Sequence, residues 1–321
     1  RVILTGSSRM SERPIEILVN ALRELGAEIS YLQNPGFPPL LISGTDFISN
    51  EVSLPANVSS QYISALMLIA PALPKGLIIN LEGSVTSLPY IEMTLRLLQE
   101  LGIEAIFKNQ KIVVSHKVSV ISKTIEVESD WSSASYFYGI AALSTSAEIR
   151  INSFKKESLQ GDATLSNIYG KLGVKTSFEG NMLVLKRIPT ELPQTLKLDL
   201  NKTPDIAQTI AVTCLGLGIG CRLTGLHTLK IKETDRLMAL KNEIEKFGAE
   251  VFVDENSLSF SEVKNLKNRV KIETYNDHRM AMAFAALSIK TEVLIENPEV
   301  VSKSYPKFWD HLKALDFQLE K

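Results

Sequence analysis

The sequence predicts an α/β fold in two domains, built from repeated units in which helices pack against sheets. Three observations support this. The chain has 321 residues, which is enough for about two domains. Short strand-like segments alternate with helical ones along its whole length. A helix–glycine–strand pattern also recurs four times at intervals of 71 to 76 residues. A self-similar period of this size indicates repeated supersecondary units.

The recurring pattern ends a helix with glycine and then begins a strand. Glycine suits this position because the residue after a helix often needs a positive φ. The four copies are Leu25-Gly26-Ala27, Leu101-Gly102-Ile103, Leu172-Gly173-Val174 and Phe247-Gly248-Ala249.

A second kind of helix start recurs at a matching interval. Each copy places polar, N-cap-type residues before a nearly all-apolar helix, and helices that are apolar all round are buried. Polar residues at such ends are either caps or ligand contacts. Asp130 and Asp277 are interpreted as N-caps, and His278 as a core or capping residue. The copies are Ser59-Ser60-Gln61, Asp130-Trp131-Ser132, Thr203-Pro204-Asp205 and Asn276-Asp277-His278.

Short strands are predicted between the helices. Each unit then follows the order strand, helix, strand, helix, strand, strand, and four units are visible, the first incomplete at its start. We place the domain boundary near Glu128, which gives domains at 1–128 and 129–321. The predicted strands lie at 2–6, 40–44, 51–55, 76–81, 111–115, 124–128, 148–152, 182–186, 195–200, 222–226, 270–274 and 292–296.

Composition narrows the functional classes. Hydrophobic residues make up 45% and charged residues 22%, as in ordinary globular proteins. The net charge of −1 implies no general affinity for nucleic acid or an anionic membrane. No apolar run approaches the roughly 20 residues that span a bilayer. Cys214 and Cys221 lack metal-ligand spacing, which favours two inert thiols in a reducing compartment such as the cytoplasm.

Cations recur where helices are expected to start. Lys232 and Arg236 stand four residues apart in a helix predicted to open near Lys230. Like charges at that spacing repel, and the amino end of a helix is itself partly positive. For a lone helix a solvated face is the better interpretation. However, Arg9 and Arg13 repeat the spacing, and Arg279 opens the last apolar helix. The recurrence favours a site for phosphates or carboxylates.

Neutral donors and carboxylates accompany these cations. The side chains of Ser59, Ser60, Gln61 and Ser87 could donate to phosphate oxygens and hydroxyls. Asp205 could be an N-cap and Glu233 a salt-bridge partner, or both could transfer protons. The residues alone leave both alternatives open.

Taken together, the motifs resemble those of the enolpyruvyl transferases, in particular the shikimate-pathway members that glyphosate inhibits. The resemblance runs in family order along the whole chain. It is carried by Leu4-Thr5-Gly6, Arg9-Met10, Glu12-Arg13-Pro14, Ser59-Ser60-Gln61, Ser87, Pro89-Tyr90, Asp130, Ser132-Ser133-Ala134-Ser135-Tyr136-Phe137, Pro204-Asp205, Lys232-Glu233-Thr234-Asp235-Arg236-Leu237, Tyr275-Asn276-Asp277-His278-Arg279-Met280-Ala281-Met282 and Ser304-Tyr305-Pro306.

The resemblance implies two domains of three βαβαββ units each, an inside-out α/β barrel arrangement, of which this chain would carry four units of six. The implied reaction moves the enolpyruvyl group of phosphoenolpyruvate to the 5-hydroxyl of shikimate 3-phosphate and releases phosphate, in aromatic amino-acid biosynthesis. No metal or organic cofactor is implied. A monomer in the cytoplasm, binding neither nucleic acid nor membrane, is expected.

The resemblance also implies residue roles. Asp205 would take the proton of the attacking hydroxyl with Lys232 close by, and Glu233 would handle the proton on the phosphoenolpyruvate methylene. Phosphoenolpyruvate would be held by Arg9, Arg236, Arg279 and Lys303. Shikimate 3-phosphate would be held by Ser59, Ser60, Gln61, Ser87, Asp205 and Lys232.

Departures from the family pattern leave alternatives. The family's opening portion is not found before Arg1, so a polypeptide limited to residues 1–321 is expected to be inactive. Thr228 replaces an Asn of many relatives, and Lys303 is displaced from its usual place. The alternatives are the sister enzyme acting on a UDP-sugar, UDP-N-acetylglucosamine, and a non-catalytic phosphate-binding fragment. The sister enzyme uses a loop cysteine, whereas Cys214 and Cys221 lie in an apolar run.

Overall fold

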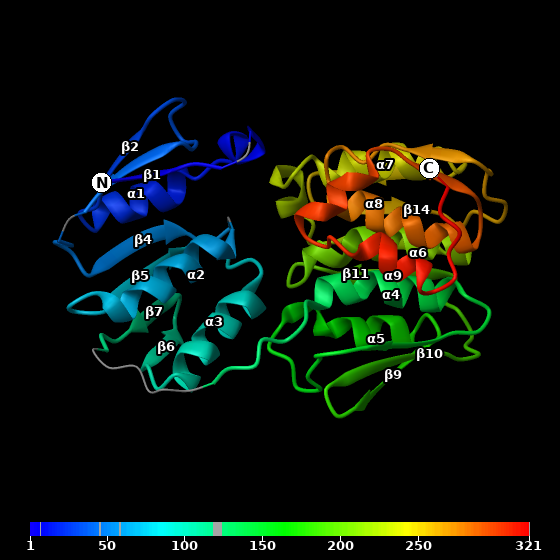
Figure 1. Cartoon of the computed structure of the whole chain (residues 1–321), viewed down its shortest axis with the longest axis horizontal. Coiled ribbons are helices and arrows are strands. Elements are labelled where there is room, and N and C mark those ends of the chain that lie inside the picture. The colour runs from blue at the N-terminus through cyan, green and yellow to red at the C-terminus, as the bar shows by residue number, and fades with distance from the viewer. Residues whose placement is uncertain (7, 45, 58, 118–123, 321) are drawn as a thin grey trace. The chain divides into compact units, whose positions relative to one another are not determined.

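A computed structural model describes residues 1–6, 8–44, 46–57, 59–117 and 124–320 of the chain. The chain forms two compact units, Arg1–Ile125 and Glu126–Lys321, coloured blue to cyan and green to red in Figure 1. The two units are described separately below. The predicted boundary at residue 128 lies three residues beyond this division and remains a prediction.

The described residues of unit 1 form two sheets. The first is antiparallel, with strand order β1-β3-β2, and the second has the order β4-β5-β7-β6, in which only β4 and β5 run parallel. Its elements are β1 (Val2–Leu4), η1 (Ser8–Glu12), α1 (Glu16–Glu24), β2 (Glu28–Tyr31), β3 (Leu40–Ser43), β4 (Glu51–Pro55), α2 (Ser60–Ile69), η2 (Ala70–Ala72), β5 (Leu77–Glu82), α3 (Leu88–Glu100), β6 (Ala105–Lys108) and β7 (Lys111–Val114).

Unit 2 holds three sheets, with strand orders β8-β10-β9, β11-β12-β14-β13 and β15-β16. Its elements are α4 (Trp131–Leu143), β8 (Glu148–Ile151), η3 (Gly161–Thr164), α5 (Leu165–Gly170), β9 (Val174–Glu179), β10 (Met182–Arg187), β11 (Thr195–Asp199), η4 (Pro204–Ile206), α6 (Ala207–Leu217), β12 (Gly220–Thr224), η5 (His227–Ile231), α7 (Arg236–Glu245), β13 (Val251–Val253), β14 (Leu258–Phe260), β15 (Val270–Ile272), α8 (His278–Ala285), η6 (Ala286–Ile289), β16 (Val293–Ile295), η7 (Pro298–Lys303) and α9 (Phe308–Lys313).

Three apolar helices, α4, α6 and α8, form the core of unit 2 and pack on one another. Figure 1 shows them stacked, with sheet strands such as β9 and β10 at the edge of the unit. Their close approach needs glycine: a Cβ on Gly216 of α6 would lie 2.6 Å from a methyl of Leu143. The polar residues predicted to open these helices therefore lie at the ends of a buried bundle.

The repeat is visible in the sheets. The β4-β5-β7-β6 and β11-β12-β14-β13 sheets share one topology, a parallel pair followed by two antiparallel pairings. The four glycines predicted to follow helices all have positive φ, between 72° and 109°, which confirms that prediction. The mixed α/β class is likewise confirmed, while the count of four units among six remains a prediction.

One predicted strand is wrong. Residues 124–128, all of them described, form no strand. Instead the carboxylate of Glu128 accepts hydrogen bonds from the indole of Trp131, the backbone of Lys155 and the hydroxyl of Ser158. The carboxylate of Glu126 also accepts from the side-chain amide of Asn181 at 3.3 Å, so side-chain bonds rather than strand pairing hold this segment to unit 2. In the described part of the chain, no helix is both long and apolar enough to cross a membrane.

Candidate active site

The buried guanidinium of Arg236 is the centre of a charged cluster in unit 2. Arg236 is the first residue of α7 and only 1% exposed. The carboxylate of Asp235 caps this helix by accepting the backbone N–H groups of Leu237 and Met238, both at 3.1 Å. The helix therefore begins at Arg236, not near Lys230 as predicted. Lys232 lies in the turn before it, so the two cations do not share a helical turn.

Three carboxylates surround the Arg236 guanidinium, one at each nitrogen. The distances are 2.6 Å from Nε to Asp277 Oδ2, 3.0 Å from Nη1 to Asp205 Oδ1 and 2.7 Å from Nη2 to Glu233 Oε2. The recurring cations predict an external anion that relieves the cation at this helix end. In this structure protein carboxylates balance it instead, as burial of a charge requires.

Asp205 connects Arg236 to two further cations. It lies in η4, just before α6, and makes no capping bond, so the N-cap interpretation is wrong. Its carboxylate is 3.5 Å from Lys232 Nζ and 3.5 Å from Arg279 Nη2. Burial would raise the pKa of Asp205, but Arg279, Lys232 and Arg236 together hold that pKa well below its usual range.

Glu233 forms the second arm of the cluster. Besides Arg236, its carboxylate contacts Lys303 Nζ at 2.8 Å, at the end of η7. Burial would raise the pKa of Glu233, but Arg236 and Lys303 hold it well below the usual range. Asp205 and Glu233 are therefore both ionised near neutral pH. The structure brings together the predicted residues Asp205, Lys232, Glu233, Arg236, Arg279 and Lys303.

Arg279, the second residue of α8, is held by groups that the sequence argument missed. Its Nη1 donates to the backbone carbonyl of Asp205 at 3.2 Å, and its Nη2 to Ser132 Oγ at 3.4 Å. The Ser132 hydroxyl in turn donates to the buried carboxylate of Asp162. Ser132 did stand at a recurring helix start, but nothing in the sequence pairs it with Asp162, thirty residues away.

Asp277 and His278 complete the start of α8. Asp277 Oδ1 accepts the backbone N–H of Arg279 at 2.9 Å, which confirms the predicted N-cap. The amide of Gln208 also reaches Asp277, at 3.5 Å. His278 is buried, and burial together with Arg279 lowers its pKa to about 4. It is therefore neutral at physiological pH, as expected of a core histidine.

Unit 1 brings its own predicted residues to neighbouring helix starts. Ser59 caps α2 by accepting the N–H of Gln61 at 3.3 Å, and Ser60 opens the helix. Ser87 precedes α3 with a positive φ of 52°. The two starts lie side by side, because the backbone N–H of Thr86 donates to the carbonyl of Ala56. The side chain of Arg9, in η1, lies outside the described part of the chain.

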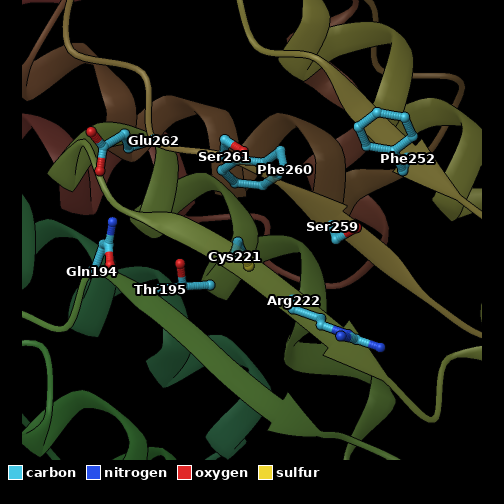
Figure 2. A pocket seen from close by; sticks show the side chains of 9 residues that line it. All are labelled: Gln194, Thr195, Cys221, Arg222, Phe252, Ser259, Phe260, Ser261 and Glu262. Carbon is cyan, nitrogen blue, oxygen red and sulfur yellow. The ribbon is translucent and has the colours of Figure 1, made fainter.

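A separate hollow of about 410 Å³ lies on the β11-β12-β14-β13 sheet. Figure 2 shows its lining side chains, among them Thr195 of β11, Arg222 of β12 and Phe252 of β13. None of its lining residues belongs to the charged cluster. The described residues contain no group of three or more His, Cys, Asp or Glu side chains that could hold a metal ion.

Comparison with known proteins gives one consistent family. The profile described as EPSP synthase (3-phosphoshikimate 1-carboxyvinyltransferase) matches residues 1–312. A 3-phosphoshikimate 1-carboxyvinyltransferase of Bacteroides fragilis is 44% identical over 320 residues, covering 99% of this chain and 78% of the relative. One of Vibrio atlanticus is 38% identical over 98% of this chain and 73% of its own length.

The fold has a solved counterpart as well. The structure of EPSP synthase from Acinetobacter baumannii superposes with a TM-score of 0.75 over 97% of this chain and 73% of that one, at 20% identity. The fold of this chain is therefore that of a solved EPSP synthase.

Proposed function

Because the chain belongs to the EPSP synthase (3-phosphoshikimate 1-carboxyvinyltransferase) family, we propose that the charged cluster of unit 2 is its phosphoenolpyruvate site. The enzyme transfers the enolpyruvyl group of phosphoenolpyruvate to the 5-hydroxyl of shikimate 3-phosphate and releases phosphate, a step of the shikimate pathway. The alternative of a UDP-sugar transferase is set aside by this family membership.

The geometry of Arg236, Arg279 and Lys303 supports the assignment of the charged cluster to phosphoenolpyruvate. All three converge on Asp205 and Glu233, so their charges lie within one small region. Phosphoenolpyruvate carries a phosphate and a carboxylate, and guanidinium groups bind both with paired N–H donors. We assign Arg236, Arg279 and Lys303 to this substrate, with Arg9 as a further ligand. Substrate oxygens would replace part of the contacts that the two carboxylates make now.

We assign shikimate 3-phosphate to the neutral donors of unit 1 and to Asp205 and Lys232. Ser59 and Ser60 open α2, where backbone N–H groups and the helix dipole favour a phosphate. Gln61 lies in the first turn of α2, and Ser87 directly precedes α3. Lys232 supplies a point charge, and only 29% of its side chain is exposed.

Proton transfer is assigned to Asp205 and Glu233. Attack of the 5-hydroxyl oxygen on the enol carbon requires a base for its proton, and the methylene carbon must receive a proton. Elimination of phosphate from the resulting tetrahedral intermediate then requires that proton to leave the methyl group again. Asp205 is proposed as the base with Lys232 beside it, and Glu233 as the group that serves the methylene carbon.

The lowered pKa values of Asp205 and Glu233 place a condition on this assignment. Cations hold the pKa of Asp205 and of Glu233 low, so neither is a good base or acid while it pairs with Lys232, Arg236, Arg279 or Lys303. When substrate anions take over those cations, both pKa values rise toward the working range. The substrates therefore help to prepare the groups that act on them.

The observation that carries the proposal is the convergence of Arg236, Arg279 and Lys232 on Asp205. Its test is phosphate release from both substrates by the protein expressed from its complete gene. Arg279→Lys should lower kcat/KM by about 10² or more, because removal of a preorganised charge contact costs roughly that much. Arg150→Lys, in an exposed ion-pair network of β8, is the control. Equal rates for both variants would disprove the assignment.

We also propose a monomer that works in the cytoplasm. Cys214 and Cys221 are buried free thiols, which persist in a reducing compartment such as the cytoplasm. Sedimentation equilibrium of the protein from its complete gene tests the monomer, and a mass of two or more chains would disprove it.

A further inference from the structure

The loop before α8 adopts an unfavourable backbone conformation. Tyr275 and Asn276 have φ of 53° and 54°, in the left-handed region that residues with a Cβ rarely occupy. Two consecutive residues of this kind persist only where surrounding contacts impose them. The loop closes with a 2.8 Å hydrogen bond from the N–H of Asp277 to the carbonyl of Thr274.

Helix α7 holds this loop at two points. At its first residue, Arg236 binds the carboxylate of Asp277. Seven residues later, on the same face, Glu243 Oε1 accepts the hydroxyl of Tyr275 at 2.9 Å and Oε2 accepts the N–H of Glu273 at 3.1 Å. Glu243 is completely buried, and Lys246 Nζ balances its charge at 2.6 Å.

The second attachment point controls the position of Asp277. Asp277 follows the two left-handed residues directly, and its carboxylate both holds Arg236 and caps the helix that carries Arg279. A shift of the loop therefore moves both guanidinium groups together. From these contacts we propose that Glu243 and Tyr275 are positioning residues of the reaction. Their hydrogen bond fixes the loop that sets Arg236 and Arg279 for phosphoenolpyruvate. This inference rests on the proposed function of those two arginines.

Tyr275→Phe tests the bond with the smallest change. In the protein expressed from its complete gene, the KM for phosphoenolpyruvate should rise roughly tenfold, because small displacements of binding groups are costly. The KM for shikimate 3-phosphate should rise less, because of its two proposed ligands in unit 2 Asp205 contacts these arginines and Lys232 does not. Tyr138→Phe is the matched control: it removes a buried hydroxyl bonded to Thr176 at 2.8 Å, away from the loop.

A purely structural role would lower the melting temperature of both tyrosine variants and leave both KM values unchanged, and that result would overturn the proposal. Glu243→Leu removes the acceptor altogether and should raise the KM for phosphoenolpyruvate at least as much as Tyr275→Phe does. In the Glu243→Leu background, Tyr275→Phe should add little, because the hydroxyl has already lost its partner. A full further increase in that background would mean that the two residues act separately, against the proposal.

Asn276→Gly tests the backbone conformation itself. Glycine adopts a positive φ without steric cost, so the loop should need its attachment less. In a Tyr275→Phe background this change should restore the KM for phosphoenolpyruvate at least threefold. If the KM for phosphoenolpyruvate does not recover, the proposed role of the strained backbone is wrong. Arg279→Lys distinguishes failure of the proposed function from failure of this inference. If Arg279→Lys leaves the KM for phosphoenolpyruvate unchanged, the proposed function is wrong. If Arg279→Lys raises that KM and Tyr275→Phe does not, only this inference is wrong.

Discussion

At the scale of single residues, the site is a set of charges that compensate one another. Arg236 is buried among Asp205, Glu233 and Asp277, each within 3.0 Å of one of its nitrogens. A buried ion network of this kind contributes little net stability, because desolvation offsets much of the attraction. Its value is that it holds cations and carboxylates in place for substrates.

Asp205→Asn should remove the proposed base without changing the volume of the side chain. We expect kcat to fall by about 10² to 10⁴, the usual range for loss of a general base. The measurement is steady-state phosphate release. Glu255→Gln is the control, since Glu255 is an exposed carboxylate paired with Lys230. A kcat within twofold of the unmodified enzyme would show that Asp205 does not accept the proton.

His278 should make the stability of the protein depend on pH. Its pKa is about 4 in the folded chain and about 6.5 when unfolded, so below pH 6.5 the unfolded state binds the proton more readily. Stability is complete above pH 6.5 and falls as the pH drops toward 4, by up to about 3 kcal/mol. Urea unfolding between pH 4 and 7 measures this. His278→Gln should flatten the slope in that window, and an unchanged slope would contradict the assignment.

At the scale of elements, helix starts determine where functional side chains lie. Asp235, Asp277 and Ser59 each cap a helix whose first residues belong to the predicted site. The caps fix the direction of the first turn and so the base of each functional side chain. The cap of Asp235 also places the start of α7 at Arg236, later than the predicted start near Lys230.

Asp235→Ala should cost about 1 kcal/mol, the usual loss on removal of an N-cap. It should also lower kcat/KM, because Arg236 is the first residue of the uncapped helix. Asp254→Ala is the comparison, because it removes two similar backbone bonds, from the N–H groups of Asn256 and Ser257, in an exposed turn. Urea titration and phosphate release on both variants compare the two effects. Equal stability and equal activity of Asp235→Ala and the unmodified protein would rule out this role.

At the scale of the whole molecule, the two units have separate hydrophobic cores. Every buried residue of the largest core cluster belongs to unit 2, and the two smaller clusters belong to unit 1. Both tryptophans of the chain, Trp131 and Trp309, are in unit 2. Tryptophan fluorescence therefore reports unit 2 alone, whereas circular dichroism reports both units.

Gly76→Ala should destabilise unit 1 selectively. Gly76 has φ of 66°, and a Cβ there would lie 2.2 Å from the carbonyl oxygen of Val114 in β7. We expect a loss of at least about 2 kcal/mol. The unfolding transition in urea followed by circular dichroism should split in two or move to a lower urea concentration. The midpoint followed by tryptophan fluorescence should stay unchanged. A fluorescence midpoint that falls by the same amount would mean that the two units unfold together.

The sequence by itself determined the repeat, the α/β class and the family. Glycine C-caps and polar starts of apolar helices are local signals, because φ preference and capping depend on a few neighbouring residues. The same locality led to the errors: the predicted start of α7 near Lys230 is six residues too early, and residues 124–128 form no strand. The capping bonds of Asp235 determine where α7 begins, and the side-chain bonds of Glu128 hold residues 124–128. The local sequence patterns carry no information about either set of bonds.

Only the tertiary structure decided how the charges are arranged. Sequence patterns identified Arg236, Arg279 and Asp205. They predicted repulsion between Arg236 and Lys232, and they left Asp205 as a possible N-cap. Their real partners are 31 to 147 residues apart in the chain: Arg236 with Asp205 and Asp277, and Arg279 with Ser132. Such pairs form because the starts of α4, α6, α7 and α8 come to one place. That placement depends on packing of the whole core, which no local pattern records.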